Sequence, residues 1–408
     1  MPPKPIAIRA PRLFDGARFS AGPATVLIDD GRILAVEDGL ANPGEQFQII
    51  DRPNSTMLPG LIDTHVHLVA DSGRAALDRI PGFTADELDA VITGGLRRHL
   101  ANGVTTIRDL GDRRFSVVDR RDRQRAGRTT EPEPTIIASG PPLTSPGGHC
   151  AAMGGEVRGV PAITDAVRER VGRRVEVVKI MASGGMNTIG TDVLQPQFSF
   201  AELQAAVDLA HAAGLPVSIH AHALTAVEQA LEVFAEGIEH CSCLTEKGPY
   251  LSEDVLDRLA ASGAAVGAAL GMPPPSEFEY APPNVRLLMA QTGVGPEQIV
   301  AQRMELMGRM YRAGVTLVTG SDAGIAPWLA HGLLRGSIYT LAEISGSIAA
   351  ALAASTSIAA GVCSVGDRKG LLRTGYDADI CIVDGDLQAD VHALERVSDV
   401  VLGGTVLS

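Results

Sequence analysis

The feature that most constrains the fold is a regular alternation of short apolar runs with segments of helical periodicity. Eight runs rich in apolar and β-branched residues follow one another: "LIDTHVHL", "VTTIRDLG", "TIIASGPPL", "VEVVKIMASG", "PVSIHAHA", "GIEHCSCL", "AAVGAALG" and "VTLVTGSDAG". Helix-patterned segments such as "FTADELDAVITGGLRRHLANG" lie between them, with Ser or Thr before the segment and Gly after it. Strands that are buried on both faces are continuously apolar, so the pattern predicts an α/β fold, a (β/α)8 TIM barrel, over residues 58–374.

The two ends of the chain show a different hydrophobic pattern, in which apolar and polar residues alternate. Residues 1–57 contain "ATVLIDDGRILAVEDG", in which apolar alternation around Asp-Asp-Gly predicts a β-hairpin. The tail, residues 375–408, alternates similarly in "GYDADICIVDG" and "VSDVVLGGTVL". We expect the two ends to pair as one composite β-sandwich. The uncharged segment "ISGSIAAALAASTSIAAGVC" is as long as a membrane span, but its Ala, Ser and Gly content predicts a buried, closely packed helix instead.

Composition limits the function classes. A chain of 408 residues that is 45% hydrophobic and 20% charged is typical of a soluble globular protein. Its net charge of −13, without a basic cluster, argues against nucleic-acid binding. The N-terminal sequence has no secretory signal, and the five cysteines show no zinc-finger spacing, which fits a reducing compartment. We expect a cytoplasmic protein with a small-molecule substrate and no nucleic-acid or membrane partner.

Polar residues fall at the ends of the predicted barrel strands, where the active site of such a barrel lies. They are His65, His67, Lys179, His220, His240 and Asp322. Strand residues i and i+2 point the same way, so His65 and His67 can reach one metal ion. A single His at a strand end is more often a hydrogen-bonded structural residue. Four of them, with an Asp and a Lys on one face, predict a metal site.

Lys179 is the most informative of these residues. It lies in an apolar strand, where a charged ammonium is costly unless it is paired. Burial lowers the pKa of a lysine, and the neutral amine can add CO2 to form a carbamate that bridges two cations. The alternative is a Lys179 that is ion-paired with Asp322 in a site without metal.

The motifs "PGLIDTHVHL", "VVKIMASGG", "SIHAHA", "GIEHC", "TGSDAG" and "GYDADICIVDGD" span nearly the whole chain in order. With them the chain resembles the amidohydrolase superfamily, and within it the imidazolonepropionase-like and Xaa-Pro dipeptidase-like branch. The resemblance implies two divalent metal ions, most often zinc, although manganese, iron or cobalt remain open. It also implies a homo-oligomer.

The resemblance further assigns roles to the predicted ligands. His65, His67 and Asp322 would hold the more buried ion and His220 and His240 the more exposed one, while carboxylated Lys179 and a hydroxide would bridge the two ions. Asp322 would take the proton of the attacking hydroxide and pass it to the leaving amine, as general base and then general acid.

Three residues are candidates for contact with substrate. His149, in "SPGGHCAAMGG", resembles a glycine-flanked His near the substrate in dipeptidase-like members, and the alternative is a plain loop residue. His222 shares a strand with His220 and either lines the site or packs behind it. Arg108 either binds a substrate carboxylate or forms a structural ion pair.

Further candidates follow from position. Many dipeptidase-like relatives carry a Tyr after "HAHA" that helps to bind the substrate carboxylate, and here that position is Leu224. This departure predicts a more hydrophobic substrate and less dependence on a free carboxylate. His331 and Trp328 follow the eighth strand and could shape the pocket. The remaining histidines expected on the surface are His99, His211 and His392.

These observations predict a metal-dependent hydrolase of a C–N bond, such as the amide of an N-acyl amino acid or a dipeptide. One alternative is a deaminase or cyclic-amide hydrolase that uses a single metal, against which Lys179 argues because single-metal branches generally lack it. Another is a structural relative that has lost catalysis, although every expected ligand position is filled.

Overall fold

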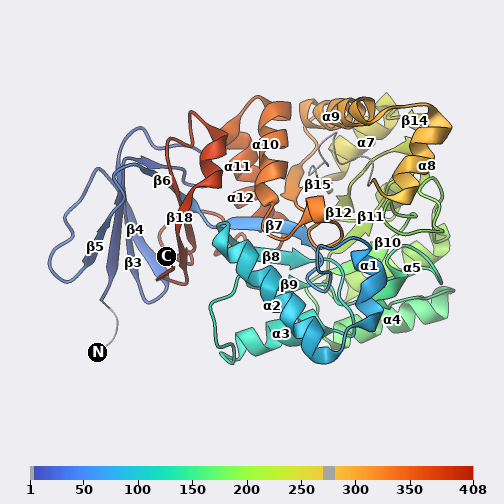
Figure 1. The fold of residues 1–408 in the computed structure, drawn as a ribbon, viewed down its shortest axis with the longest axis horizontal. Helices are drawn as coiled ribbons and strands as arrows, with labels where there is room; N and C mark the ends of the chain where they lie inside the picture. The colour runs from blue at the N-terminus through green and yellow to red at the C-terminus, as the bar shows by residue number, and fades with distance from the viewer. Residues whose placement is uncertain (1–3, 270–280, 408) are drawn as a thin grey trace.

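The computed structural model describes residues 4–269 and 281–407, and it consists of a barrel beside a β-sandwich (Figure 1). The predicted fold class is confirmed. The barrel strands, in chain order, are β7 (Leu61–Val66), β8 (Val104–Asp109), β9 (Thr135–Ala138), β10 (Val178–Met181), β11 (Val217–His220), β12 (Gly237–Glu239), β15 (Ala265–Ala269) and β16 (Leu317–Gly320).

Two parallel sheets, β7-β8-β9 and β10-β11-β12-β15-β16, make up the barrel wall. Backbone hydrogen bonds join them on both sides. The amide of Leu143 donates to the carbonyl of Lys179 over 2.9 Å, and the amide of Asp322 donates to the carbonyl of His65 over 2.8 Å. The second closure places Asp322, two residues after β16, directly beside the end of β7.

Helices cover the outside of the barrel. They are α1 (Ala76–Arg79), α2 (Ala85–Ala101), α3 (Ser116–Arg125), α4 (Val160–Gly172), α5 (Phe200–Ala212), α6 (Leu224–Glu232), α7 (Glu253–Ser262), α8 (Pro283–Thr292), α9 (Pro296–Arg312), α10 (Leu334–Ser345), α11 (Ile348–Ala354) and α12 (Ser357–Val362). Capping boxes start α2, with Thr84 and Glu87, and α5, with Ser199 and Glu202. Each box satisfies free amides at a helix start, which explains why these predicted boundaries are accurate.

The uncharged segment from Ile344 does not form the single helix that we expected. It contains the end of α10, then α11 and α12, with a break at Ser355 and Thr356. Their hydroxyls donate hydrogen bonds to the carbonyls of Ala351 and Leu352, so side chains satisfy backbone acceptors at the break in the helix. Within the described ranges, no helix is long and apolar enough to cross a membrane.

The sandwich is built from both ends of the chain, blue and red in Figure 1. One sheet contains β4 (Arg32–Asp38), β3 (Ala24–Asp29), β1 (Ile6–Ala10) and β5 (Gln48–Asp51), and the other contains β19 (Thr405–Leu407), β18 (Val397–Leu402), β17 (Ile380–Asp384), β6 (Ser55–Pro59) and β2 (Arg12–Leu13). The predicted hairpin is β3–β4, and its turn residues Asp30 and Gly31 have φ of 45° and 73°. Residues such as Val26, Met57 and Ile382 fill the core between the sheets.

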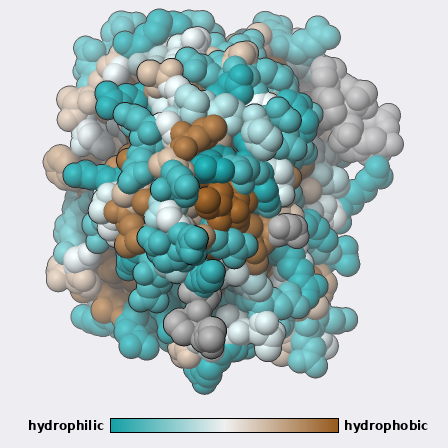
Figure 2. Space-filling model, turned by 90° about the vertical axis from the view of Figure 1, so that its left-hand side faces the viewer, coloured by the Kyte–Doolittle hydropathy of each residue, from teal (hydrophilic) through white to brown (hydrophobic). Residues whose placement is uncertain are grey.

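The outer end of the sandwich carries exposed apolar side chains. Figure 2 looks onto this end and shows an apolar patch surrounded by hydrophilic residues. Exposed apolar side chains of the sheet that contains β4 and β5 include Leu34, Val36 and Ile49, which are 45%, 36% and 38% exposed. The patch lies on the sandwich end of the molecule, away from the barrel.

Candidate metal centre

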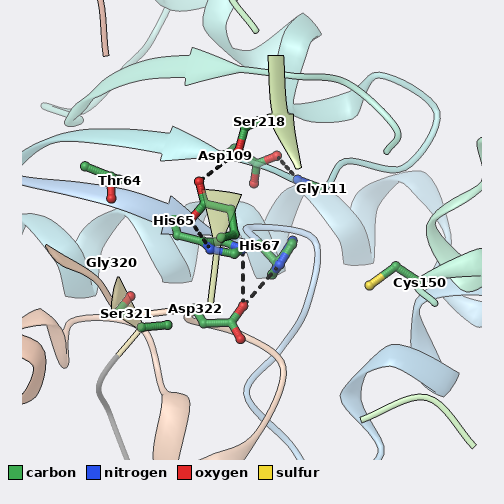
Figure 3. A network of polar contacts seen from close by, with 12 residues as sticks. Thr64, His65, His67, Asp109, Gly111, Cys150, Ser218, Gly320, Ser321 and Asp322 are labelled. Atoms are coloured by element: carbon green, nitrogen blue, oxygen red, sulfur yellow. Dashed lines mark hydrogen bonds and ion pairs between the residues drawn. The ribbon is translucent and has the colours of Figure 1, made fainter. Parts of the chain in front are cut away.

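The first group of potential ligands contains His65 and His67, at the end of β7, and Asp322, two residues after β16. The Oδ1 atom of Asp322 lies 3.5 Å from Nε2 of His65 and 3.2 Å from Nε2 of His67 (Figure 3). Burial lowers the pKa of His65, which keeps its ring neutral. Burial alone would raise the pKa of Asp322, but the adjacent His65 and His67 outweigh it and hold this pKa below its usual value. A neutral His65 imidazole beside an ionised carboxylate is a combination that binds a metal ion.

The second group contains His220 at the end of β11, His240 directly after β12, and also His222. The His220 ring centroid lies 4.6 Å from that of His222 and 4.8 Å from that of His240. All three side chains are buried, and burial lowers the pKa of each below the usual value. In both groups, the ligand atoms lie within 4.8 Å of one another. The structure thus brings together the histidines that the sequence singled out, with His222 added.

Lys179 on β10 is 1% exposed, and its Nζ has no hydrogen-bond partner among the described residues. Within that part of the chain no carboxylate lies close enough for an ion pair with it, so the alternative pair with Asp322 is absent. Burial lowers the pKa of Lys179 to about 8. An orphaned, readily deprotonated amine beside two groups of buried histidines fits a centre for two divalent ions.

Glu239, on β12, is a site residue that sequence reasoning missed. Its carboxylate lies 3.0 Å from Nδ1 of His65, and it accepts hydrogen bonds from Arg108 over 3.0 Å and from Ser218 over 2.7 Å. Burial would raise the pKa of Glu239, but His65 and Arg108 hold it far below the usual value. The carboxylate fixes the His65 ring with Nε2 facing Asp322. A Glu in the apolar run "GIEHC", directly before a metal-site His, is the signal that could have found it.

Close packing around this network requires glycine. A Cβ on Gly267 would lie 1.8 Å from the Glu239 carboxylate, and one on Gly111 would lie 2.3 Å from Nδ1 of His67. His240 and Asp322 also adopt left-handed backbone conformations, with φ of 66° and 52°. Backbone hydrogen bonds to Gly267 and His65 hold these two residues in place. Such strain is concentrated at functional sites in proteins.

A cavity of about 170 Å³ opens beside the two groups. His149, His222 and Asp322 lie on its polar side. Its apolar walls are formed by Leu244, Val285, Leu288, Ile299, Leu306, Ile325, Trp328 and Leu329. The His149 ring lies 4.4 Å from that of His220, and its Nδ1 lies 2.8 Å from the hydroxyl of Thr188. The cavity can therefore present an apolar molecule of small size to the metal-site residues.

Three predicted substrate contacts do not line this cavity. Arg108 faces inward to Glu239 and the carbonyl of Thr64, so its guanidinium forms the structural ion pair that the sequence left open. Leu224 begins α6 and packs against the main hydrophobic core. Nε2 of His331 donates a hydrogen bond to the carbonyl of Ala70 over 2.9 Å, which holds the ring behind the site.

The expectation that His99 lies on the surface is wrong. His99 is fully buried on the inner face of α2, three residues after the buried Leu96, and its Nε2 lies 3.2 Å from Nδ1 of His331. Its position in a helix suggested exposure, but the helix period places residue 99 on the buried stripe. His211 and His392 are exposed, as expected.

Comparison with known proteins gives the family. The model of the amidohydrolase family matches residues 56–407. The chain belongs to this family. As an amidohydrolase it is a metal-dependent enzyme that acts on carbon–nitrogen bonds, as its sequence predicts.

Individual relatives of this amidohydrolase are distant in sequence. Ochratoxinase of Aspergillus niger is 24% identical over 379 residues, which cover 83% of this chain and 72% of that protein. The crystal structure of a Xaa-Pro dipeptidase with bound methionine has a TM-score of 0.85 and 24% identity, covering 99% of this chain and 100% of its own. A prolidase complexed with N-methylphosphonate-L-proline has a TM-score of 0.84 and 25% identity, covering 99% of each chain.

Proposed function

We propose that this amidohydrolase cleaves the amide bond of a small N-acyl amino acid or dipeptide with two divalent ions, zinc in the native enzyme, and with carboxylated Lys179 between them. The observation that carries the proposal is the buried amine of Lys179, which has no partner among the described residues. The charge of Lys179 lowers the pKa of His65 in one group of potential ligands and the pKa of His220 in the other. Two bound divalent metal ions would supply an activated water and polarise the scissile carbonyl.

We assign metal binding and proton transfer to individual residues of the chain. His65, His67 and Asp322 would hold one ion, and His220 and His240 the other. Asp322 has a lowered pKa and lies at the cavity, so it is available to accept a proton and return it to the leaving amine.

The hydrogen bonds of His222 favour a tautomer with the proton on Nε2, and this tautomer can contact the substrate but cannot bind a metal ion through Nε2. Arg303 can only donate, and it donates to the hydroxyl of Ser242 over 3.1 Å. Ser242 can then donate its own proton to Nδ1 of His222, which lies 2.9 Å away. In that arrangement Nε2 of His222 carries a proton, and it would donate a hydrogen bond to the substrate.

The relatives support an amide substrate. The solved structures with similar folds include a dipeptidase, a prolidase and ochratoxinase. A single-metal deaminase or cyclic-amide hydrolase would leave the second group of histidines and Lys179 without a role. Action in the cytoplasm on a small molecule, as a homo-oligomer without nucleic-acid or membrane partners, is part of the same proposal and rests on composition and resemblance.

The test combines metal analysis with a panel of dipeptides and N-acyl amino acids. We expect close to two ions per chain and release of a carboxylate and an amine. Full activity with one tightly bound ion, or release of ammonia from an amino-substituted ring, would replace this proposal with the single-metal alternative.

A variant of Lys179 gives the sharper result. Lys179→Ala should lose at least one ion per chain together with activity, because it removes the proposed bridge between the two groups. Lys247→Ala removes an exposed lysine and should keep both ions. Metal content by elemental analysis and kcat/KM for the best panel substrate measure the two effects. A Lys179→Ala protein with two ions and normal turnover would contradict the bridging role.

A further inference from the structure

Arg303 extends from α9 into the wall of the cavity. Its neighbours on the same helix face are Ile299 and Leu306, which also line the cavity. The Nη1 group donates to the hydroxyl of Ser242 over 3.1 Å, and Nη2 donates to the carbonyl of Ala269 over 2.9 Å. These two contacts hold the guanidinium at a fixed place in an otherwise apolar wall.

The positive charge of Arg303 is not matched by a neighbouring acid in the part of the chain that the structure describes. Among residues 4–269 and 281–407 no carboxylate lies within ion-pair distance of it, and its buried Nε has no hydrogen-bond partner there. The other arginines of α9 differ, since Arg309 pairs with Glu253 and Arg312 with Glu305. A buried guanidinium without a counter-charge is costly, and a carboxylate ligand would offset that cost through charge-assisted hydrogen bonds.

The guanidinium is also close to the reacting centre. Ser242 links it to Nδ1 of His222, so Arg303 lies two hydrogen bonds away from a histidine of the second metal-binding group. A single amino-acid unit could span this separation. Apolar side chains, including Leu244 and Trp328, fill much of the remaining wall.

We propose that Arg303 binds the carboxylate of the substrate and makes this enzyme specific for amides that carry a free acid and an apolar side chain. The inference rests on the proposed amide hydrolysis and names its substrate class. It replaces the expectation drawn from Leu224, which starts α6 and does not line the cavity. The carboxylate anchor is instead Arg303 on α9.

The first experiment compares the best panel substrate with the same amide in which hydrogen replaces the carboxylate. Wild type should prefer the acid by about tenfold to hundredfold in kcat/KM, the effect of one or two charge-assisted hydrogen bonds. Arg303→Gln should slow the acid much more than its decarboxylated counterpart and so abolish most of this preference. Arg303→Lys should keep part of it, and Arg309→Gln, a charge change on the same helix, should keep all of it.

The second experiment measures binding without turnover. Calorimetry with 4-methylpentanoate should give a Kd that Arg303→Gln raises about tenfold or more, whereas binding of 4-methylpentan-1-ol should be unaffected. If no amide in the panel is hydrolysed, the proposed function fails while this measurement still decides the role of Arg303. Equal rates for the acid and its decarboxylated counterpart in wild type, or an equal loss for both in Arg303→Gln, would overturn the inference.

Discussion

At the scale of single residues, the site depends on groups that never face the cavity. Glu239 is fully buried and contacts His65, Arg108 and Ser218, each from a different strand. A carboxylate behind a metal-site histidine fixes its tautomer and orientation and increases its basicity. The charge of Arg108 compensates the buried Glu239, so the pair supports His65 without leaving an unmatched charge in the barrel.

We predict that Glu239→Gln weakens metal binding by about 10–100-fold, because the amide keeps the shape of the side chain but loses the charge that orients His65. Competition with a chromogenic chelator measures this affinity. Glu236→Gln, three residues earlier, removes an acid that pairs with His211 at the surface and should bind metal normally. Equal affinities for the two variants would show that the Glu239 charge does not act on the centre.

At the scale of secondary-structure elements, the sequence predicts those strands and site residues whose positions depend on local periodicity and local side-chain chemistry. The strand ends carrying His65, His67, His220 and His240 were found because each strand is a distinct apolar run. Arg303 was not found, since its role arises only when α9 packs over the end of β15 and brings it to Ser242. The sequence signal that could have identified Arg303 is its position between Ile299 and Leu306 on the apolar face of the helix, where a charged residue is unusual.

The start of α3 provides a pH-sensitive element. Asp112 accepts hydrogen bonds from the amides of Val117 and Val118, at 3.0 and 3.3 Å, and its other oxygen has no partner among the described residues. Burial raises the pKa of Asp112 to about 7 in spite of these bonds. A carboxyl whose folded pKa exceeds its unfolded value contributes stability below the unfolded pKa, and this contribution is lost as the pH rises through the folded pKa.

We therefore predict that Asp112→Asn becomes more stable relative to wild type as the pH rises from about 4 to 7, by at most about 1.4 kcal/mol per pH unit. The Asn side chain can accept the same amide protons but never ionises. Urea unfolding of both proteins across this range gives the difference in free energy of unfolding. Asp119→Asn changes an exposed acid in the same helix and should show no such trend. A difference independent of pH would contradict the prediction.

At the scale of the whole molecule, the sandwich is joined directly to the metal site. Strand β6 of the sandwich ends at Pro59, and β7, which carries His65, begins at Leu61. The amide of Gly60 between them donates to the carbonyl of Asp379 over 2.8 Å, which ties this junction to the C-terminal segment. This hydrogen bond therefore joins the start of the first barrel strand to segments from both ends of the chain.

The potential metal ligands come from strands on opposite sides of the barrel, so bound ions would link parts of the chain that are far apart in sequence. The unfolded chain does not hold these donors together, and ions therefore bind the folded state preferentially. At a free concentration 100 times Kd, one ion would add about 2.7 kcal/mol to the free energy of unfolding. We predict that chelation lowers Tm by several degrees and that zinc restores it, with a smaller gain in Lys179→Ala. Calorimetric scans of stripped and reloaded protein measure the shift. Identical Tm values in the two states would show that the two groups of donors do not bind metal selectively in the folded protein.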